Sequence, residues 1–598
     1  MKSFLTKLII LLTVSLVNSI KWTDNIYKNY TYLNASYKHI PSLDGLNTIL
    51  IESKYQSINY IDLSNNKIRF IDQLKPFKTN LRTLFLEYNN IQKIDVLTDF
   101  VRLEKLELSS NQISNITSLI GLINLKLLYL DDNMIADVSS LRLLTKLELL
   151  SLTRNKIINV DSLANLTNLF YLGLSNNQIS NINNINNLTK LKILTLNNNL
   201  IKNINVLKSF NKLENINLAQ NQIDTIEPIR YLINIKHLFV ETNLITNIEP
   251  ISNLTNLINL DISGNQLKTI DPLKYLTNLT WLDFSRNQIE NIDPIRRLTY
   301  LSNLYMNTNR IINIDHLSNL IDLIELDISN NNNIISSSFD SIKNLKKLVT
   351  LGVSNLNISN IDFLSNLINL RYLHINDNRI KSLDPLRYLN LLVILSIGNN
   401  LIENMDPILN LTNLEYLFIH QNKIEKLSSF KHLNKLQIIV MTLNQIKHID
   451  QIDKLQNIEY IGLSYNQIEN INCVLNWTNI SRLVISNNNI KRLDFNLVNL
   501  TNNIKYLDLR NNHQNLSIDF HRQIDLMPKN YQIVRRLDGD ILIFIKSISL
   551  LTKNYISNLN DCRLILLYLK KNIQLNVVTH SQAKEFISKC KIIDLEFL

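Results

Sequence analysis

Hydrophobic and polar residues follow one another along most of this chain in a pattern that returns every 22 residues. Two successive repeats show it, with the hydrophobic residues Leu282, Phe284, Ile289, Ile292, Ile295, Leu298 and Leu301, then Leu304, Met306, Ile311, Ile314, Leu317, Leu320 and Leu323. A hydrophobic pair spaced two apart is typical of a strand with one buried face. The later positions lie three apart, which favours a tight 3₁₀-like coil over an α-helix. Each repeat is therefore predicted to be a short strand, a turn and a compact return.

One polar residue type keeps the same place in nearly every repeat. The asparagines of this column are Asn89, Asn111, Asn133, Asn155, Asn177, Asn199, Asn221, Asn243, Asn265, Asn287, Asn309 and Asn331, then Asn378, Asn400, Asn422, Asn444, Asn466 and Asn488, with Asn66 before and Asn512 after. A period in this range predicts a solenoid. The amide side chain has donors and an acceptor, so it can satisfy backbone groups that a turn leaves unpaired. These asparagines are therefore interpreted as an internal ladder, not a binding site.

Proline marks a second column. Six of the nine prolines follow an acidic residue at one point of the repeat, as in Glu249-Pro250 and Asp293-Pro294. The acidic residue is predicted to cap a helical turn, with proline at its first position, where no amide donor is needed.

The first 19 residues are typical of a secretory leader. Lys2 and Lys7 precede the apolar run Leu8 to Val17, and small residues follow at Val17-Asn18-Ser19. This run is shorter than the ~20 residues that cross a bilayer, and no later segment qualifies. We therefore expect a chain without a membrane span, secreted or held in the secretory lumen. Sequons, including Asn115, Asn165 and Asn278, then predict a glycoprotein.

Cysteine use does not match disulfide-capped secreted repeats. The chain has three cysteines, none of them in residues 20–60. Cys562 and Cys590 pair in the tail, or all three thiols are unpaired and buried; the sequence leaves both alternatives open.

The repeat, as in "LTNLTWLDFSRNQIENIDPIRRLTYL", resembles the leucine-rich repeat superfamily in its short 22-residue class. That class includes intracellular regulatory subunits of protein phosphatase 1 and secreted bacterial internalins. The resemblance covers residues 46–516 and implies an α/β solenoid, a horseshoe with a parallel concave sheet and a 3₁₀ and coil convex face. The expected organisation is a signal peptide at 1–19, an N-terminal cap and incomplete repeat at 20–60, a solenoid at 61–516 with about 21 repeats, and a small helical C-terminal capping region at 517–598.

Two places depart from the repeat. Asn331 is followed at the next ladder position by Leu356, and the inserted residues predict either a longer outer helical turn or a drifted repeat without a role. In the N-terminal region, Ile49 and Ile51 are predicted as the strand of the incomplete repeat, with Lys54 at the ladder point.

Motifs for chemistry are absent. The eight glycines are dispersed, and no phosphate-binding loop, nucleophile elbow, HExxH or CxxC occurs. The formal charge of +11 is spread over the repeats, which argues against nucleic-acid binding. We therefore expect no enzyme, no cofactor and no metal site.

The strand residues that point away from the solenoid interior are the candidate partner-binding set. They are Tyr129, Tyr171, His237, Phe239, Asp261, Trp281, Asp283, Tyr305, Asp327, Tyr372, His374, Tyr416, Phe418 and Tyr460. Exposed aromatic residues are typical anchors of protein interfaces. Asp261, Asp283 and Asp327 share one column, which predicts an acidic centre and a partner with a basic patch. Tyr and Phe also favour strands and stack on cross-strand neighbours, so simple packing stays an equal alternative.

Taken together, these features predict a secreted, non-enzymatic recognition or adhesion protein that binds another protein through its concave face. The alternative is an intracellular scaffold or phosphatase regulatory subunit, which the low cysteine content favours and the leader opposes.

Overall fold

The computed structural model describes residues 32–38, 40–43, 58–452, 455, 457–477, 480–491, 504, 506–512 and 532–533. The predicted leader at 1–19 and all of the predicted C-terminal region except 532–533 lie outside the described residues. The chain divides into two compact units, residues 1–341 and 342–598, and each unit is described by itself.

Unit 1 contains one three-residue strand per repeat. The strands are β1 (Tyr32–Asn34), β2 (Tyr60–Asp62), β3 (Thr83–Phe85), β4 (Lys105–Glu107), β5 (Leu127–Tyr129), β6 (Leu149–Ser151), β7 (Tyr171–Gly173), β8 (Ile193–Thr195), β9 (Asn215–Asn217), β10 (His237–Phe239), β11 (Asn259–Asp261), β12 (Trp281–Asp283), β13 (Asn303–Tyr305) and β14 (Glu325–Asp327). Neighbouring strands within the unit pair in parallel, as Leu260 with Leu282. The side chain of the middle residue points toward the 3₁₀ returns and is buried in the core. The side chains of the first and third residues point to the opposite face of the sheet, away from that core.

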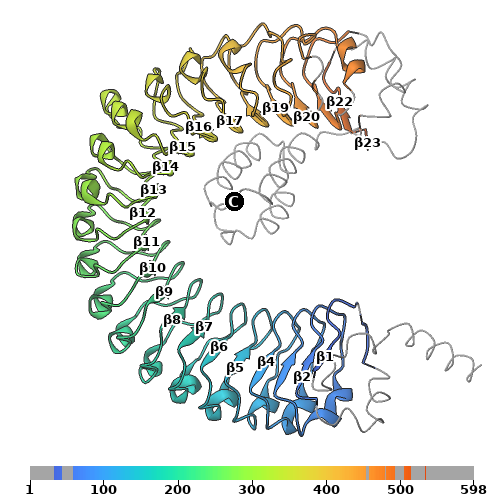
Figure 1. The fold of residues 1–598 in the computed structure, drawn as a ribbon, viewed down its shortest axis with the longest axis vertical. Helices are drawn as coiled ribbons and strands as arrows, with labels where there is room; N and C mark the ends of the chain where they lie inside the picture. Colours follow the sequence, from blue (N-terminus) through green and yellow to red (C-terminus); the bar gives the residue numbers. More distant parts are fainter. Residues whose placement is uncertain are drawn as a thin grey trace, which may run out of the picture. The chain divides into compact units, whose positions relative to one another are not determined.

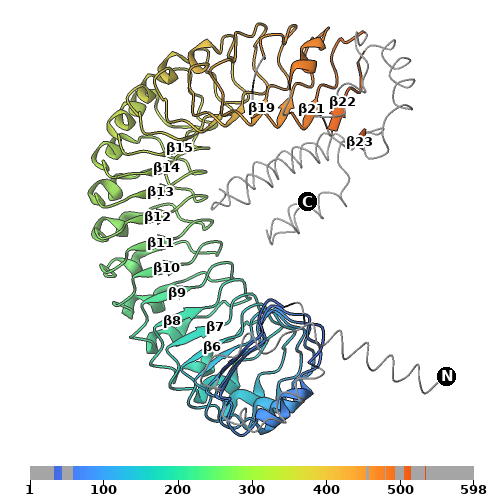
Figure 2. The same cartoon turned by 45° about the vertical axis from the view of Figure 1, so that its right-hand side comes forward.

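The return path of each repeat from β2 to β13 contains a 3₁₀ helix, as the three-residue spacing predicts. These helices are η3 (Asp72–Phe77), η4 (Asp95–Asp99), η5 (Thr117–Leu119), η6 (Ser139–Leu143), η7 (Asp161–Asn165), η8 (Asn183–Ile185), η9 (Asn205–Ser209), η10 (Glu227–Tyr231), η11 (Glu249–Ile251), η12 (Asp271–Tyr275), η13 (Asp293–Arg297) and η14 (Asp315–Asn319). The strands of the unit lie side by side along its inner side, with the helices along its outer side (Figure 1). Figure 2 shows the same two layers from another angle.

Unit 2 repeats this arrangement. Its strands are β15 (Thr350–Gly352), β16 (Tyr372–His374), β17 (Ile394–Ser396), β18 (Tyr416–Phe418), β19 (Ile438–Val440), β20 (Tyr460–Gly462), β21 (Arg482–Val484), β22 (Tyr506–Asp508) and β23 (Gln532–Ile533), and its helices are η16 (Asp362–Leu364), η17 (Asp384–Leu386), η18 (Asp406–Ile408) and η19 (Asn472–Asn476). Consecutive strands again pair in parallel, as Leu395 with Leu417. The fold class predicted from the repeat, a leucine-rich repeat solenoid with a parallel sheet and 3₁₀ returns, is confirmed.

The longest return, η15 (Ser336–Asn344), occupies the predicted insertion and crosses the boundary between the units. Ser341 donates its hydroxyl to the Ile314 and Ser338 carbonyls at 3.0 and 2.7 Å. Of the two alternatives for the insertion, the structure has the longer helical turn.

The asparagine column is an internal hydrogen-bond ladder, as predicted. Asn287 donates through Nδ2 to the carbonyls of Ile262, Phe284 and Ser285 at 3.0, 3.0 and 3.2 Å. Its Oδ1 accepts the Leu267 N–H at 3.0 Å. Because Ile262 and Leu267 belong to the preceding repeat, each asparagine joins two repeats as well as closing its own turn.

At the N-terminal end the strand paired with β2 is β1 (Tyr32–Asn34). The segment around Ile49 and Ile51, predicted as the strand of an incomplete repeat, lies outside the described residues. The Asn66 side chain confirms the pairing of β1 with β2, because its Nδ2 donates to the Ala35 carbonyl at 2.9 Å. The long stretch between these strands hid this partner, since no 22-residue interval connects them. Residues 44–57 lie outside the described part of the chain.

The predicted capping role of the acidic residues was wrong. In η11 and η13 the acidic residue begins the helix and proline is second, with no side-chain cap from the preceding isoleucine. The residue two positions before the acid provides the bond instead: Asn247 Oδ1 accepts the Glu249 N–H at 2.8 Å, and Asn291 Oδ1 accepts that of Asp293 at 2.9 Å. An amide side chain two residues earlier reaches this donor, as in an Asx turn.

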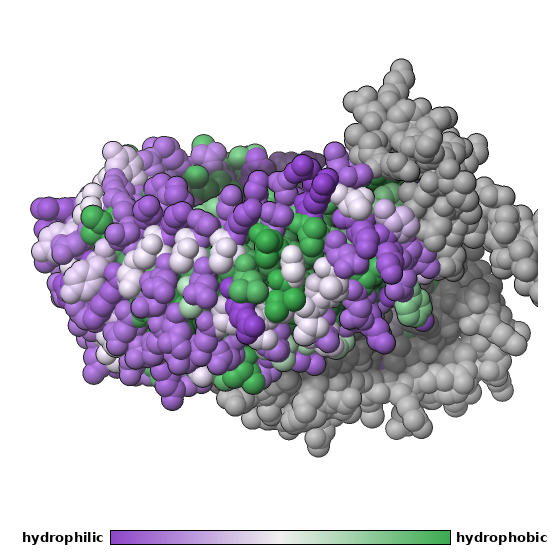
Figure 3. All heavy atoms as spheres, turned by 90° about the horizontal axis from the view of Figure 1, so that it is seen from below, coloured by the Kyte–Doolittle hydropathy of each residue, from purple (hydrophilic) through white to green (hydrophobic). Residues whose placement is uncertain are grey.

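The face seen in the space-filling view is mostly hydrophilic, with a group of hydrophobic residues near its middle and others scattered around it (Figure 3). Among the described residues, no helix is both long enough and apolar enough to cross a membrane.

Candidate functional site

The predicted partner-binding residues all occupy the first or third position of a strand. We call these outward positions of β1–β14 the strand face of unit 1, and those of β15–β22 the strand face of unit 2. Unit 1 carries Tyr129, Tyr171, His237, Phe239, Asp261, Trp281, Asp283, Tyr305 and Asp327, and unit 2 carries Tyr372, His374, Tyr416, Phe418 and Tyr460.

Their exposure differs from the prediction. All are half-buried except Tyr460, which is only 7% exposed. A ring at the first position of a strand lies flat over a small third residue: a Cβ on Gly462 would lie 3.1 Å from Tyr460 Oη, and one on Gly173 would lie 3.1 Å from Tyr171 Oη. The half-buried ring of Tyr171 therefore fits the packing interpretation of the aromatic residues, whereas Tyr460 is too deeply buried to be an exposed anchor.

A group of aromatic rings spans β10 to β13. The ring centroids of Phe239 and Trp281 are 6.4 Å apart, and those of Trp281 and Tyr305 are 5.7 Å apart, both in tilted arrangements. Such tilted pairs are favourable ring geometries. Trp281 thus stands half-exposed between two rings that restrict its motion. A held, half-exposed indole has the character of an interface anchor.

Two carboxyl groups lie on the neighbouring strands of this aromatic group. Asp261 and Asp283 face each other as paired residues of β11 and β12. Each accepts one backbone N–H through Oδ1, from Ser263 at 2.9 Å and Ser285 at 2.8 Å, which closes the turn after its strand. The aspartates therefore have a structural role in addition to any binding role.

Burial and mutual repulsion disfavour the charged forms of these carboxyl groups. Burial, then the charge of Glu241, raises the pKa of Asp261 to about 7. Burial, then the charge of Asp261, raises the pKa of Asp283 to about 8. Burial also raises the pKa of Glu241 to about 7. Near neutral pH this acidic centre is therefore partly protonated, and a nearby cation would favour its ionised form.

The third aspartate of the column lies at the far side of the aromatic group. Asp327 closes its own turn by accepting the Ser329 N–H at 3.0 Å. Its strand neighbour Glu325 accepts a hydrogen bond from the Tyr305 hydroxyl. The acidic column and the aromatic group are therefore connected across β13 and β14. We define Phe239, Asp261, Trp281, Asp283 and Tyr305 as the central group.

In unit 2 the predicted residues form a separate set on β16, β18 and β20. The Tyr416 hydroxyl donates to Gln437 Oε1 at 3.1 Å. His374 follows Tyr372 on the same face of β16.

Sequence reasoning missed a second aromatic series on β1–β5. Tyr32 stacks on Tyr60 with centroids 4.2 Å apart, and Tyr60 meets Phe85 edge-on at 5.3 Å. Lys105 follows, with its ammonium 4.6 Å from the Phe85 ring and 5.7 Å from the Tyr129 ring. The same first and third positions would have identified these residues, had the pattern been followed to the first strand.

Sequence reasoning also missed a group of apolar residues on the strand face of unit 2, namely Ile438, Val440, Val484 and Tyr506. They are 8%, 4%, 3% and 9% exposed. A hydrophobic first or third strand residue does not by itself identify them, because Leu127, Ile193 and Ile394 are also hydrophobic first residues of strands and are only half-buried.

No group of three or more His, Cys, Asp or Glu residues suited to a metal occurs in the described ranges. Cys473 is a half-buried free thiol whose pKa is raised to about 12 by burial and then by the charge of Asp450. A thiol held neutral in this way is a poor nucleophile. Cys562 and Cys590, and hence their pairing, lie outside the described residues.

Comparison with known proteins identifies the repeats. The family described as leucine-rich repeats (2 copies) matches residues 79–121, 255–296 and 277–319, and a further leucine-rich repeat family matches 412–468. No curated protein sequence matches the chain.

Three solved structures are similar to this chain, and the second and third of them share its fold. An internalin of Listeria monocytogenes is 29% identical over 55% of this chain and 93% of that chain, with a TM-score of 0.46. A leucine-rich repeat protein of Leptospira interrogans is 23% identical over 64% of this chain and 94% of that chain, with a TM-score of 0.51. The Arabidopsis receptor kinase HAESA, in complex with the peptide hormone IDA and the co-receptor SERK1, is 20% identical over 81% of this chain and 83% of that chain, with a TM-score of 0.54. With its repeating strand, asparagine ladder and 3₁₀ return, and with the leucine-rich repeat family matches at 79–121, 255–296, 277–319 and 412–468, the chain belongs to the leucine-rich repeat superfamily.

Proposed function

We propose that this chain is a secreted, non-enzymatic recognition protein that binds another protein through the strand face of unit 1, at the central group. The observation that carries the proposal is the position of Trp281, half-exposed between Phe239 and Tyr305 and flanked by Asp261 and Asp283. Aromatic anchors beside carboxylates suit a lysine or arginine side chain, which gains from both the ring faces and the charge.

The electrostatics of the central group support a cationic partner. The pKa of Asp283 is raised because the carboxyl group is partly buried beside another carboxyl group. A cation inserted between the two carboxyl groups replaces the solvation that they lose on burial and reduces their mutual repulsion. Binding of the cation therefore favours ionisation of the carboxyl groups, and their ionisation favours binding of the cation. Within the same face, the Lys105 ammonium already lies 4.6 Å from the Phe85 ring and 5.7 Å from the Tyr129 ring, so aromatic rings on this face do accommodate a cation.

Exposed glycosylation sequons on the side of unit 1 opposite the strands also support the proposal. The sequon asparagines Asn115, Asn165, Asn187, Asn253 and Asn278 are exposed. Asn165 ends η7, opposite the strands. Glycans on the outer side would leave the strand face accessible to a partner. HAESA, which shares the fold, is in complex with a peptide hormone and a co-receptor.

An array of 15-residue peptides that vary in net charge and aromatic content tests the binding site with the full chain. We expect retention of peptides with a lysine or arginine beside apolar residues, and about tenfold or greater loss of affinity in Trp281→Ala. Tyr300→Ala is the matched control, because Tyr300 is 65% exposed and outside the strand face. Equal retention of acidic and basic peptides, or equal loss in both variants, would refute the proposed site.

Secretion is tested separately. Expression with the native leader, followed by N-terminal sequencing of protein from the medium, is expected to give a chain that begins near Ile20. A full-length chain found only in the cytosol would instead support the intracellular scaffold.

A further inference from the structure

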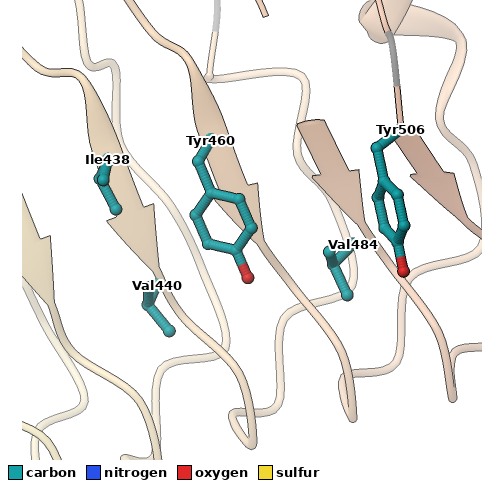
Figure 4. Close-up of a cluster of buried hydrophobic side chains, with 5 residues drawn as sticks. All are labelled: Ile438, Val440, Tyr460, Val484 and Tyr506. Atoms are coloured by element: carbon teal, nitrogen blue, oxygen red, sulfur yellow. The ribbon is translucent and has the colours of Figure 1, made fainter. Parts of the chain in front are cut away.

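On strands β19 to β22 the outward residues form an apolar patch that is itself buried. The apolar patch consists of Ile438, Val440, Tyr460, Val484 and Tyr506, which are 3% to 9% exposed, and the rings of Tyr416 and Phe418 pack against its edge. Their side chains lie on the same side of neighbouring strands (Figure 4). In a solenoid repeat these positions point away from the internal core.

Cross-strand packing does not account for this burial. Tyr372 at the first position of β16 also has a paired strand on each side, yet it is half-buried, as is Trp281 on β12. The strands β19, β20 and β22 are buried at all three positions, whereas β16, β17 and β18 are buried only at the middle one. Among the described outward strand positions that carry a large hydrophobic side chain, those of β19–β22 alone are this little exposed, which indicates that other atoms lie across this face. The apolar patch is therefore covered.

We propose that the apolar patch is the docking site for the chain's own C-terminal segment, residues 534–598. This segment follows directly on β23, which pairs with β22 at one end of the patch, so it begins beside the surface that it covers. Its sequence contains two hydrophobic runs, Ile541 to Leu551 and Leu564 to Leu569. Runs of this kind need an apolar surface to bury against.

The chemistry of the patch agrees with such an occupant. Among its strand positions, Arg482 and Asp508 carry charge, and Asp508 is paired with Arg510 at 2.8 Å. This surface therefore resembles an internal packing face more than the polar rim of a transient interface. This docking goes beyond the proposed function. It makes the strand face of β19–β22 inaccessible to a partner and leaves the central group on β10–β13 as the accessible anchor.

A photo-crosslinker tests the docking in the full chain. Tyr460 is replaced by p-benzoylphenylalanine, which keeps an aromatic ring, and the crosslinked peptide is identified by mass spectrometry after irradiation. We expect a crosslink within one chain to a peptide from 534–598. The matched control carries the same crosslinker at Tyr171, also a first-position tyrosine over a glycine, and is expected to give no crosslink to that segment. A dimer band, which means a second copy, would overturn the proposal, as would a crosslink only to another segment or none at all.

A second measurement uses hydrogen exchange. Val484→Thr keeps the side-chain shape but adds a hydroxyl to the covered surface, and Val484→Asp adds a charge. Both are expected to speed backbone exchange in residues 541–569, the aspartate more strongly, with exchange in β10–β14 unchanged. Unchanged exchange in 541–569 in both variants would contradict the docking, whatever the peptide array shows for the central group.

Discussion

Single asparagine side chains hold this protein's repeats together. Each ladder amide uses its donors and its acceptor on backbone groups of two repeats, as Asn287 does. The constant spacing of the column made this role predictable. The residue before each asparagine was not predictable, because its backbone is left-handed although it is seldom glycine: Arg286 has φ 58° and Leu443 has φ 57°. No residue type marks that position, so only the structure identifies it.

Asn287→Ala is expected to lower the free energy of unfolding by about 1–3 kcal/mol, because buried backbone groups of two repeats lose their partner. Urea unfolding of the full chain measures the change. Asn165→Ala is the control, since Asn165 is exposed at the end of η7. Equal effects of the two substitutions would contradict the ladder role.

Asp283→Asn is expected to change how stability depends on pH. The pKa of Asp283 is raised to about 8 from 3.8, so the folded state holds its proton more tightly than the unfolded state. The contribution of this carboxyl group to stability is therefore fully present at low pH and is lost as the pH rises from about 4 through about 8. The variant should melt at a higher temperature than the parent at pH 8, with little difference at pH 4.

Thermal unfolding at these two pH values measures the effect. Asp271→Asn, at an exposed helix start, serves as the comparison and should leave the pH dependence unchanged. If the Asp283→Asn variant kept the parent's slope between pH 4 and pH 8, the burial of this carboxyl group would be disproved.

At the scale of the element, hydrophobic spacing predicted the strand and the 3₁₀ return of each repeat. The spacing could not show how rings lie on the strand face, because that depends on which small residue lies beneath or beside them. Within a single strand, the Tyr171 ring lies over Gly173 and the Tyr460 ring lies over Gly462. A third such contact joins two repeats, where the His420 ring fills the space beside Gly398.

Gly398→Ala is therefore expected to destabilise the chain by about 1–3 kcal/mol, because the new methyl group overlaps the His420 ring. The double variant Gly398→Ala with His420→Ala should lose much less than the sum of the two single changes. Urea unfolding of all four chains gives the coupling energy. Strictly additive effects would show that the ring moves away without cost.

At the scale of the whole chain, the period alone predicted the solenoid in both units and the strand positions of every candidate residue. It could not separate accessible from covered strand positions. Trp281 and Tyr460 both begin a strand and both are aromatic, yet only Trp281 is half-exposed. Whether a strand position is covered depends on residues that are distant in the sequence, and the hydrophobic pattern of one repeat does not identify those residues.

Proton release on binding tests the central claim, that the central group receives a cationic partner segment. The full chain is titrated at pH 7 with the strongest basic peptide of the array, by calorimetry in buffers of different ionisation enthalpy. Because an inserted cation lowers the raised pKa values of Asp261 and Asp283, binding should release protons, and Asp283→Asn should release fewer. Binding without proton release, or with the same release in Asp283→Asn, would place the partner elsewhere and contradict the account.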